Sequence, residues 1–258
     1  VAAVAALWTA RHAPGALVLL APADHHIADA QGFRDAAAKG AKAACDGRIV
    51  TFGIKPTHAH TGYGYIQAAE EIVADVFRVG AFREKPDADT ARGYLETGGY
   101  YWNAGIFLFS PGAMIAALKR HAPDVLDGSE AALAGAAPLD GAALLDEGAF
   151  SKVPAISIDY AVMEKTDRAA VVAPVDVGWN DIGSWTETAS DPQSAGHMLE
   201  DCRNVIARSD GPVIGAVGVE DLIIVATADA VLVARKDCAQ DVKKLVEELK
   251  RRGREDLL

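Results

Sequence analysis

Apolar runs and amphipathic segments alternate through the first part of the chain. Residues 16–20 and 48–54 are apolar runs of strand length, and residues 32–44 between them have the periodicity of a helix. A strand, a helix and a second strand in this order are typical of a parallel sheet. The first run ends in a polar tip, PAD at residues 22–24, which predicts a strand buried on both faces that stops at the edge where α/β sites lie.

Glycines and short β-like runs replace this alternation in residues 61–86, where we expect an antiparallel insertion that covers the tips of the sheet. Beyond it the pattern predicts a helix at 87–96, a strand at 101–109, a helix opened by a proline at 111–120, and an interrupted helix at 122–145. Helix and strand signals therefore continue to alternate after the insertion.

One more helix and one more strand are expected before the pattern becomes β-rich beyond residue 191. Ser157 is placed to cap a helix that runs to about residue 166, and a strand follows at 169–175. Further strands are expected at the apolar runs 213–217, 222–226 and 230–234. An amphipathic helix is expected to close the chain at 243–250.

A turn-like stretch at residues 190–196 concentrates Ser, Asp, Pro and Gly and marks the best domain boundary. We therefore expect one domain at 1–190 and a β-rich region with a closing helix at 191–258. The fold class predicted for the first domain is α/β, with a Rossmann-like, mostly parallel sheet flanked by helices.

The composition of the 258 residues narrows the classes of function. Half of the residues are apolar, which is enough for one sizeable core or two unequal lobes. The 25 basic and 36 acidic residues give a net charge of −11, which disfavours nucleic acid and anionic lipid as partners. An anionic small substrate would therefore need a local positive site.

The three cysteines, Cys45, Cys202 and Cys238, form neither a CxxC pair nor an even set, so a zinc site or a disulfide framework has little support. No apolar run is long enough to cross a bilayer, and we expect a cytoplasmic protein. Val1 stands where an initiator methionine would be, as though the sequence begins inside a longer protein.

Two aspartates lie beside strongly apolar or glycine-rich sequence, where a lone solvated carboxylate is not expected. Asp24 ends the first apolar run, and Asp181 lies in GWNDIGSW at residues 178–185. They are candidates for the ligands of one Mg²⁺ ion, which proteins commonly hold with one or two carboxylates. The alternative, favoured for each aspartate taken alone, is that it caps a following helical segment.

Three further motifs carry polar groups whose positions suit a ligand. Glu84 and Lys85 precede a proline that presents both charges at a loop, although such a pair is usually solvated surface. Gly64, in TGYGYI at residues 61–66, allows close approach of a ligand to the backbone, or simply a turn. Asn103, in an otherwise apolar strand, must hydrogen-bond to the backbone or to ligand hydroxyls if it is buried.

The order of these motifs along the chain resembles one known family. PADH at 22–25, TFGI at 51–54, TGYGYI at 61–66, residues 82–86 and WNAG at 102–105 are followed by SIDYAVMEKT and GWNDIGSW, at 157–166 and 178–185. Together they are similar to bacterial-type mannose-1-phosphate guanylyltransferases over nearly the whole chain.

The resemblance implies a glycosyltransferase-A-like nucleotidyltransferase in which mannose 1-phosphate attacks the α-phosphorus of GTP, with Mg²⁺, to give GDP-mannose and pyrophosphate. It implies that Asp24 and Asp181 hold the metal. It also implies that Lys85 contacts the sugar phosphate, and that Glu84, Gly64 and Asn103 contact the sugar. Catalytic roles are thus expected for Asp24, Lys85 and Asp181, while a homodimer is left open.

The family also carries a glycine-rich GxGxRLxP loop and a Pro-Lys element near its start, and neither occurs in these 258 residues. We therefore expect the first strand of the sheet and its phosphate loop to be missing, and the chain alone to have little activity. Two smaller departures are Ala59-His60, where the family often has Pro-Glu, and Ala104, where a serine is common. The alternatives are an inactive sugar-phosphate-binding or regulatory module, and a nucleotidyltransferase for another hexose 1-phosphate.

Overall fold

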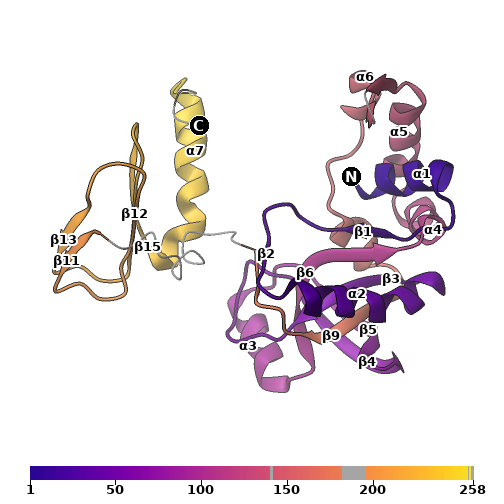
Figure 1. The fold of residues 1–258 in the computed structure, drawn as a ribbon, viewed down its shortest axis with the longest axis horizontal. Coiled ribbons are helices and arrows are strands. Elements are labelled where there is room, and N and C mark those ends of the chain that lie inside the picture. Colours follow the sequence, from indigo (N-terminus) through magenta and orange to yellow (C-terminus); the bar gives the residue numbers. More distant parts are fainter. Residues whose placement is uncertain (140–141, 182–195, 255, 257–258) are drawn as a thin grey trace. The chain divides into compact units, whose positions relative to one another are not determined.

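The structure, a computed structural model, describes residues 1–139, 142–181, 196–254 and 256. It consists of two compact units, Val1–Trp179 and Asn180–Leu258 (Figure 1). The boundary expected at 190–196 falls almost entirely outside the described residues. None of the helices in the described ranges combines the length and the apolar character that a bilayer crossing requires.

The first unit is built on a six-stranded sheet. Its strands lie in the order β1-β6-β3-β9-β5-β4, and β6 also pairs with β4. In chain order the bounds are β1 Val18–Leu20, β3 Ile49–Ile54, β4 Tyr65–Val73, β5 Val76–Arg83, β6 Tyr100–Phe109 and β9 Ala169–Val175.

The predicted mostly parallel sheet is wrong for this chain, because the sheet is mixed. Among its described strands only β3 and β9 pair in parallel, and the other pairs are antiparallel. The physical reason is that β6 runs between β1 and β3 in the opposite direction, and the hairpin of β4 and β5 joins the sheet. The expected insertion at 61–86 therefore extends the sheet and does not cover its tips.

Helices pack on both faces of the sheet. Their bounds are α1 Ala2–His12, α2 Ala30–Cys45, α3 Ala88–Thr97, α4 Pro111–His121, α5 Pro123–Ala134 and α6 Glu147–Phe150. Apolar residues of α1, α4 and α5 form one core with the sheet, and α2 contributes to a second core on the other face (Figure 1). Local signals fix the helix starts: Asp29 caps α2, Asp87 caps α3, and Ser110 caps α4 just before a proline.

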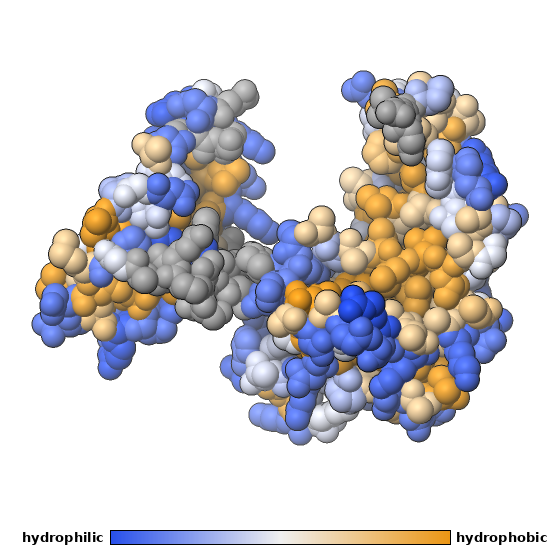
Figure 2. Space-filling model, in the orientation of Figure 1, coloured by the Kyte–Doolittle hydropathy of each residue, from blue (hydrophilic) through white to orange (hydrophobic). Residues whose placement is uncertain are grey.

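β1 was expected to be buried on both faces, and this expectation is wrong. β1 pairs only with β6 among the described strands, and Leu19 at its centre is 44% exposed. Figure 2 shows apolar side chains on the surface of the first unit between α1 and α2, where β1 lies. An apolar run alone does not distinguish an edge strand from a central one.

Two predicted helices are shorter than expected. The interrupted helix at 122–145 ends with α5 at Ala134, and a hairpin of β7 (Ala137–Leu139) and β8 (Ala142–Leu144) follows. The helix expected after Ser157 is only a short π-helical turn, η1 (Asp159–Met163), although the Ser157 hydroxyl does accept a hydrogen bond from the Tyr160 N–H at 3.4 Å. The alanine-rich composition of residues 122–145 favours helix, but the pairing of β7 with β8 overrides this intrinsic preference in the short segment after α5.

The second unit is small and β-rich, as predicted. It contains β11 Met198–Glu200, β12 Ile206–Ser209, β13 Gly215–Val217, β14 Leu222–Ala226, β15 Val231–Arg235, the 3-10 helix η4 Lys236–Asp241 and α7 Val242–Arg251. The pairs β11·β13 and β12·β14 are parallel. Ile206, Ile223 and Val225 form its small core.

Candidate functional site

Three of the predicted sugar-binding residues meet where β4 begins beside β6. The pairing places Tyr65 opposite Trp102, and the Asn103 N–H donates a hydrogen bond of 2.8 Å to the Gly64 carbonyl. A β-carbon added at Gly64 would lie 2.5 Å from Oε2 of Glu84 and 3.3 Å from Cβ of Asn103. The Glu84 carboxylate therefore lies against the backbone of residue 64, in the space that a β-carbon would occupy.

Asn103 is 8% exposed, and both Oδ1 and Nδ2 of its side-chain amide form hydrogen bonds. Its Oδ1 atom lies 2.8 Å from the Thr51 hydroxyl and accepts a hydrogen bond of 3.2 Å from the Gly105 N–H. Its Nδ2 atom donates to Oδ1 of Asp159 at 3.0 Å. Gly64, Glu84, Asn103 and Asp159 together are called the Asn103 cluster below.

Glu84 is a carboxyl group in a partly desolvated setting, since its side chain is only 13% exposed. Burial, with smaller contributions from the nearby Asp159 and Glu164, raises its pKa to about 7, although Lys85 acts in the opposite direction. The backbone N–H of Glu84 donates to the Glu164 carboxylate at 3.2 Å. Glu84 can therefore exchange a proton near neutral pH.

Lys85 combines an exposed side chain with an unusual backbone. Its Nζ lies 3.8 Å from Oε1 of Glu84, and its side chain is 60% exposed. Its φ angle of +46° lies in the left-handed region, which is unfavourable for a residue with a β-carbon. The turn before Pro86 thus holds a cation next to the Asn103 cluster at some cost in backbone strain.

Asp159 and Glu164 were not singled out by the sequence analysis. Both lie in SIDYAVMEKT, which was quoted for the resemblance and otherwise interpreted only as a capped helix. Burial raises the pKa of Asp159, while its bonds to Asn103 and Ser157 lower it. A carboxylate between Ile158 and the buried run 161–163 was the signal that could have identified it.

An aromatic bridge, formed by His25, Tyr63, Trp102 and Trp179, connects four of the motifs. The Trp179 indole N–H donates to Nδ1 of His25 at 3.1 Å. The Tyr63 ring lies 5.5 Å from Trp179 and 5.1 Å from Trp102, both edge to face. A β-carbon added at Gly105 would lie 3.7 Å from Cε1 of His25. The PADH, TGYGYI and WNAG motifs and Trp179 of the GWND motif therefore lie together, although they are far apart in sequence.

His60, which departs from the family pattern, is part of the loop that precedes β4. Its ring stacks on Tyr63 with centroids 3.9 Å apart, and the Gly62 N–H donates to its Nδ1 at 3.2 Å. Its own backbone N–H donates to the buried Tyr65 hydroxyl at 2.9 Å. The loop is thus ordered by local bonds despite the substitution.

The two predicted metal ligands flank the aromatic bridge in sequence. Asp24 is exposed and precedes His25, whereas Asp181 is half-buried, two residues after Trp179. The capping alternative fails for Asp24 at α2, because Asp29 caps that helix. For Asp181 the segment it would cap lies outside the described residues. Asp181 belongs to the second unit, and the sharing of one ion by the two carboxylates stays a prediction.

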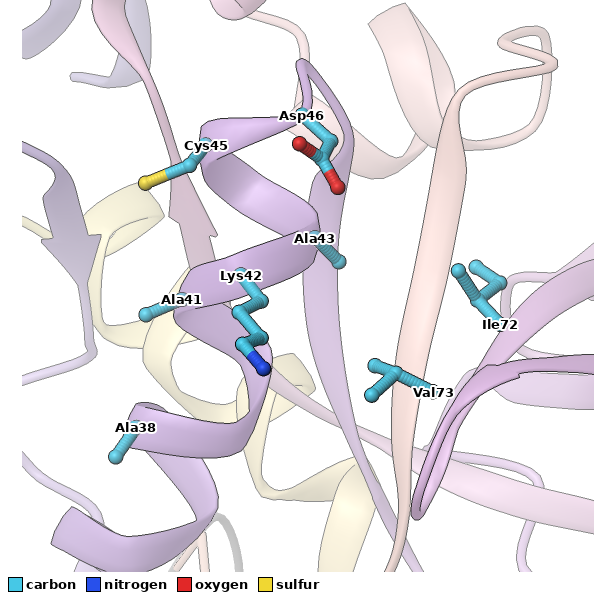
Figure 3. Close-up of a pocket in the computed structure, with 8 residues that line it drawn as sticks. All are labelled: Ala38, Ala41, Lys42, Ala43, Cys45, Asp46, Ile72 and Val73. Carbon is cyan, nitrogen blue, oxygen red and sulfur yellow. The ribbon is translucent and has the colours of Figure 1, made fainter.

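A pocket of about 490 Å³ lies apart from these residues, between the end of α2 and the end of β4 (Figure 3). Ala43 points toward Ile72 and Val73 across it. Its other lining residues are Ala38, Ala41, Lys42, Cys45 and Asp46. None of the predicted site residues lines this pocket, and its sparse polar lining does not define a site for a phosphate or a sugar.

The chain is similar to known proteins over both units. Residues 1–190 match the family described as "Nucleotidyl transferase", and residues 196–249 match "MannoseP isomerase/GMP-like beta-helix domain". The chain is 41% identical to "Mannose-1-phosphate guanylyltransferase" of Escherichia coli (strain K12), over 98% of this chain and 56% of that protein. It is 43% identical to "Xanthan biosynthesis protein XanB" of Xanthomonas campestris pv. campestris (strain B100), over 98% and 55%.

A solved structure agrees with this grouping. The crystal structure of a Thermus thermophilus protein, described as a mannose-1-phosphate geranyltransferase, matches with a TM-score of 0.82 and 33% identity, over 96% of this chain and 75% of that one. The fold and the comparisons thus define a nucleotidyl transferase domain followed by a small β-rich region. Within that class, the chain belongs to the mannose-1-phosphate guanylyltransferase family. It spans about half the length of the curated relatives it matches.

Proposed function

We propose that the protein carrying this chain transfers GMP from GTP to α-D-mannose 1-phosphate, giving GDP-mannose and pyrophosphate, with Mg²⁺. The observation that carries the proposal is the meeting of Gly64, Glu84 and Asn103 in one cluster, with Lys85 beside it. These are the residues assigned to the sugar phosphate by the resemblance. The similarity to a guanylyltransferase over nearly the whole chain supports the same reaction.

The chemistry of the Asn103 cluster suits a sugar. Carboxylates accept hydrogen bonds from hydroxyl groups, and an amide N–H donates to them, so Glu84 and Asn103 can together fix the position of a hexose. Gly64 has no β-carbon, and this lets the Glu84 carboxylate lie against the backbone beside Asn103. These groups are largely buried, which makes their hydrogen bonds to a ligand more selective than those of exposed groups.

Lys85 supplies positive charge at the proposed site. An anionic substrate needs such a local charge because the chain as a whole is acidic. The Lys85 ammonium is exposed and next to the cluster, so it can bind the phosphate of a sugar held there. In the proposed reaction a phosphate oxygen of mannose 1-phosphate attacks the α-phosphorus of GTP, and pyrophosphate leaves. Lys85 reduces the repulsion between the two anionic reactants and orients the attacking group.

The residues assigned to Mg²⁺ have the right donors for it. Asp24 and Asp181 offer hard carboxylate oxygens, and no group of three or more His, Cys, Asp or Glu side chains gathers elsewhere in the described ranges. Mg²⁺ is commonly held by one or two carboxylates, with waters and substrate phosphates as its other ligands. When bound, the ion would neutralise phosphate charge during the displacement.

We further propose that residues 1–190 form a glycosyltransferase-A-like catalytic domain and 191–258 a separate C-terminal region, in a cytoplasmic protein.

A pyrophosphate-release assay on the protein that carries this chain tests the function. We expect release that requires GTP, mannose 1-phosphate and Mg²⁺ together. Turnover with glucose 1-phosphate but not mannose 1-phosphate would assign another hexose, and no release with any hexose 1-phosphate would reject the proposal.

Calorimetry on the 258-residue chain separates the enzyme from a binding module. Binding of mannose 1-phosphate to this chain, lost in Asn103→Ala, would locate the sugar in the Asn103 cluster. Binding by the protein that carries this chain, without any turnover, would favour the sugar-phosphate-binding module. The matched control is Asn204→Ala, which removes a side-chain amide of the second unit that is not part of the cluster. Equal loss in both variants would contradict the assignment of the site.

A further inference from the structure

The orientation of the Asn103 amide decides what the cluster offers a ligand. An amide presents an acceptor oxygen on one side and an NH₂ group on the other, and turning it by 180° exchanges the two. If the oxygen faces the ligand, Asn103 accepts hydrogen bonds from sugar hydroxyls. If the NH₂ group faces the ligand, it donates to them. The neighbours of the amide must therefore hold one of the two orientations.

The Thr51 hydroxyl does not determine which of the two orientations the Asn103 amide takes. This hydroxyl lies 2.8 Å from Oδ1 of Asn103 and 3.1 Å from the Ile106 carbonyl, but it has a single proton. It can donate to Asn103, or it can donate to Ile106 and accept a bond from Asn103. Both amide orientations are therefore compatible with Thr51, which is fully buried.

Two other neighbours of the amide have fixed roles. The Gly105 backbone N–H, 3.2 Å from Oδ1, can only donate, and an ionised Asp159 carboxylate, 3.0 Å from Nδ2, can only accept. Turning the amide would place two donors face to face at Gly105 and two acceptors face to face at Asp159. Of the two contacts, the one to the carboxylate is charge-assisted and therefore the stronger.

We propose that Asp159 is a positioning residue, which holds the Asn103 amide so that its second Nδ2 proton is the group donated to the substrate. Oδ1 already has Gly105 and Thr51 as neighbours, and one of the two Nδ2 protons is used by Asp159. One N–H remains for a sugar hydroxyl. This inference rests on the proposed function and adds how the sugar is recognised.

A double-mutant cycle tests whether Asp159 acts through Asn103. Binding of mannose 1-phosphate is measured by calorimetry for wild type, Asp159→Ala, Asn103→Ala and the double variant. We expect each single change to weaken binding about tenfold, as loss of one hydrogen bond does. In the Asn103→Ala background, removing Asp159 should then have less than a twofold effect. Independent, multiplying losses would overturn the proposal, because they would show that Asp159 contacts the sugar itself.

A spectroscopic measurement keeps the test decisive if Asp159→Ala folds poorly. Asp159→Asn keeps the shape of the side chain and can still accept from Asn103, but it no longer enforces one orientation. We expect the side-chain amide NMR signals of Asn103 to shift or double in Asp159→Asn and to stay unchanged in the control Asp146→Asn. Asp146 also accepts a hydrogen bond through its carboxylate, from the Ala149 N–H at 2.7 Å, but it lies outside the cluster. Unchanged Asn103 signals in Asp159→Asn would contradict the role.

The test also distinguishes this inference from the proposed function. If the wild-type protein neither binds nor uses mannose 1-phosphate, the proposed function fails, and the NMR signals of Asn103 still report on its orientation. If the wild type binds the sugar phosphate and the two losses multiply, only the role of Asp159 fails.

Discussion

The Asn103 cluster and the Asp24 segment (residues 21–25) differ in how they are held. In the cluster, Asn103 is buried, Glu84 is nearly so, and backbone and side-chain bonds fix the amide. Asp24 is exposed, and no residue in the described part of the chain bonds to its carboxylate, although the next residue, His25, is tied to Trp179.

This difference shows which parts of the site the chain orders by itself. Groups that recognise a neutral, hydroxyl-rich ligand gain from being ordered beforehand, because ordering lowers the entropy lost on binding. A carboxylate that is buried without an ion loses its hydration, so the exposure of Asp24 is what the proposed metal site predicts before the ion and the substrate phosphates bind. Changes in the two regions should therefore have different effects, on affinity in one and on turnover in the other.

The largest effect is expected at the carboxylates proposed to hold Mg²⁺. Asp24→Asn and Asp181→Asn should each lower turnover by about 10²–10³-fold, since they remove electrostatic stabilisation of phosphate charge. For Asp24→Asn, the free energy of unfolding should change by less than about 0.5 kcal/mol, because the residue is exposed. Pyrophosphate release against Mg²⁺ concentration, and urea unfolding, measure the two quantities. Full turnover in either variant would remove that residue from the proposed metal site.

The second effect concerns Gly178, the residue before Trp179 of the aromatic bridge, and its close approach to Ala28. Gly178 has a φ angle of +60°, and a β-carbon there would lie 2.7 Å from Cβ of Ala28. Gly178→Ala should lower the free energy of unfolding by about 2–3 kcal/mol, combining backbone strain with this close contact. The control is Gly47→Ala, with φ +80° and open space around it, which should lose only about 1 kcal/mol. Equal losses would show that the approach to Ala28 is not a constraint.

The third effect separates the charge of Lys85 from its backbone. Lys85→Met should raise the KM for mannose 1-phosphate about tenfold, because a charge-assisted bond to phosphate is lost. Lys85→Gly should lose the same affinity while its free energy of unfolding rises by about 1 kcal/mol, since glycine accepts φ +46° without strain. Lys42→Met, at the pocket of Figure 3, is the control for a lost lysine. A normal KM in Lys85→Met would exclude contact with the phosphate.

The smallest effect concerns pH and Glu84. The folded pKa of about 7 lies above the ordinary value of 4.5, so protonated Glu84 stabilises the fold below about pH 4.5, and this stabilisation is lost as the pH rises through about 7. Glu84→Gln lacks this dependence. Urea unfolding at pH 5 and pH 7.5 should therefore show wild type losing more stability than Glu84→Gln over that interval. Parallel changes in both proteins would mean that Glu84 is solvated.

Much of the candidate site could be predicted from the sequence, because its residues lie in short motifs at the ends of strands. Gly64, Glu84 and Asn103 were expected together from a resemblance, and the structure brings them together. Asp159 was missed because its partner, Asn103, is 56 residues away and no local pattern reports such a bond. Whether Asp24 and Asp181 share an ion remains a prediction.

The fold was predicted less completely, and for a physical reason. Helices have local signals, and the helices predicted at 32–44 and 111–120 correspond to α2 and α4, although their caps at Asp29 and Ser110 were not predicted. The direction of strand pairing has no local signal, so the antiparallel position of β6 between β1 and β3 could not be inferred from apolar runs. The edge position of β1 was missed for the same reason.

The aromatic bridge also has a practical consequence for experiments. Of the four tryptophans in the chain, Trp102 and Trp179 both contact Tyr63, next to the residues proposed to hold the sugar phosphate. Indole emission depends on nearby charge and solvent. The unmodified protein therefore contains its own fluorescent reporter, and a ligand entering beside Tyr63 can be followed by a change in emission without any attached dye.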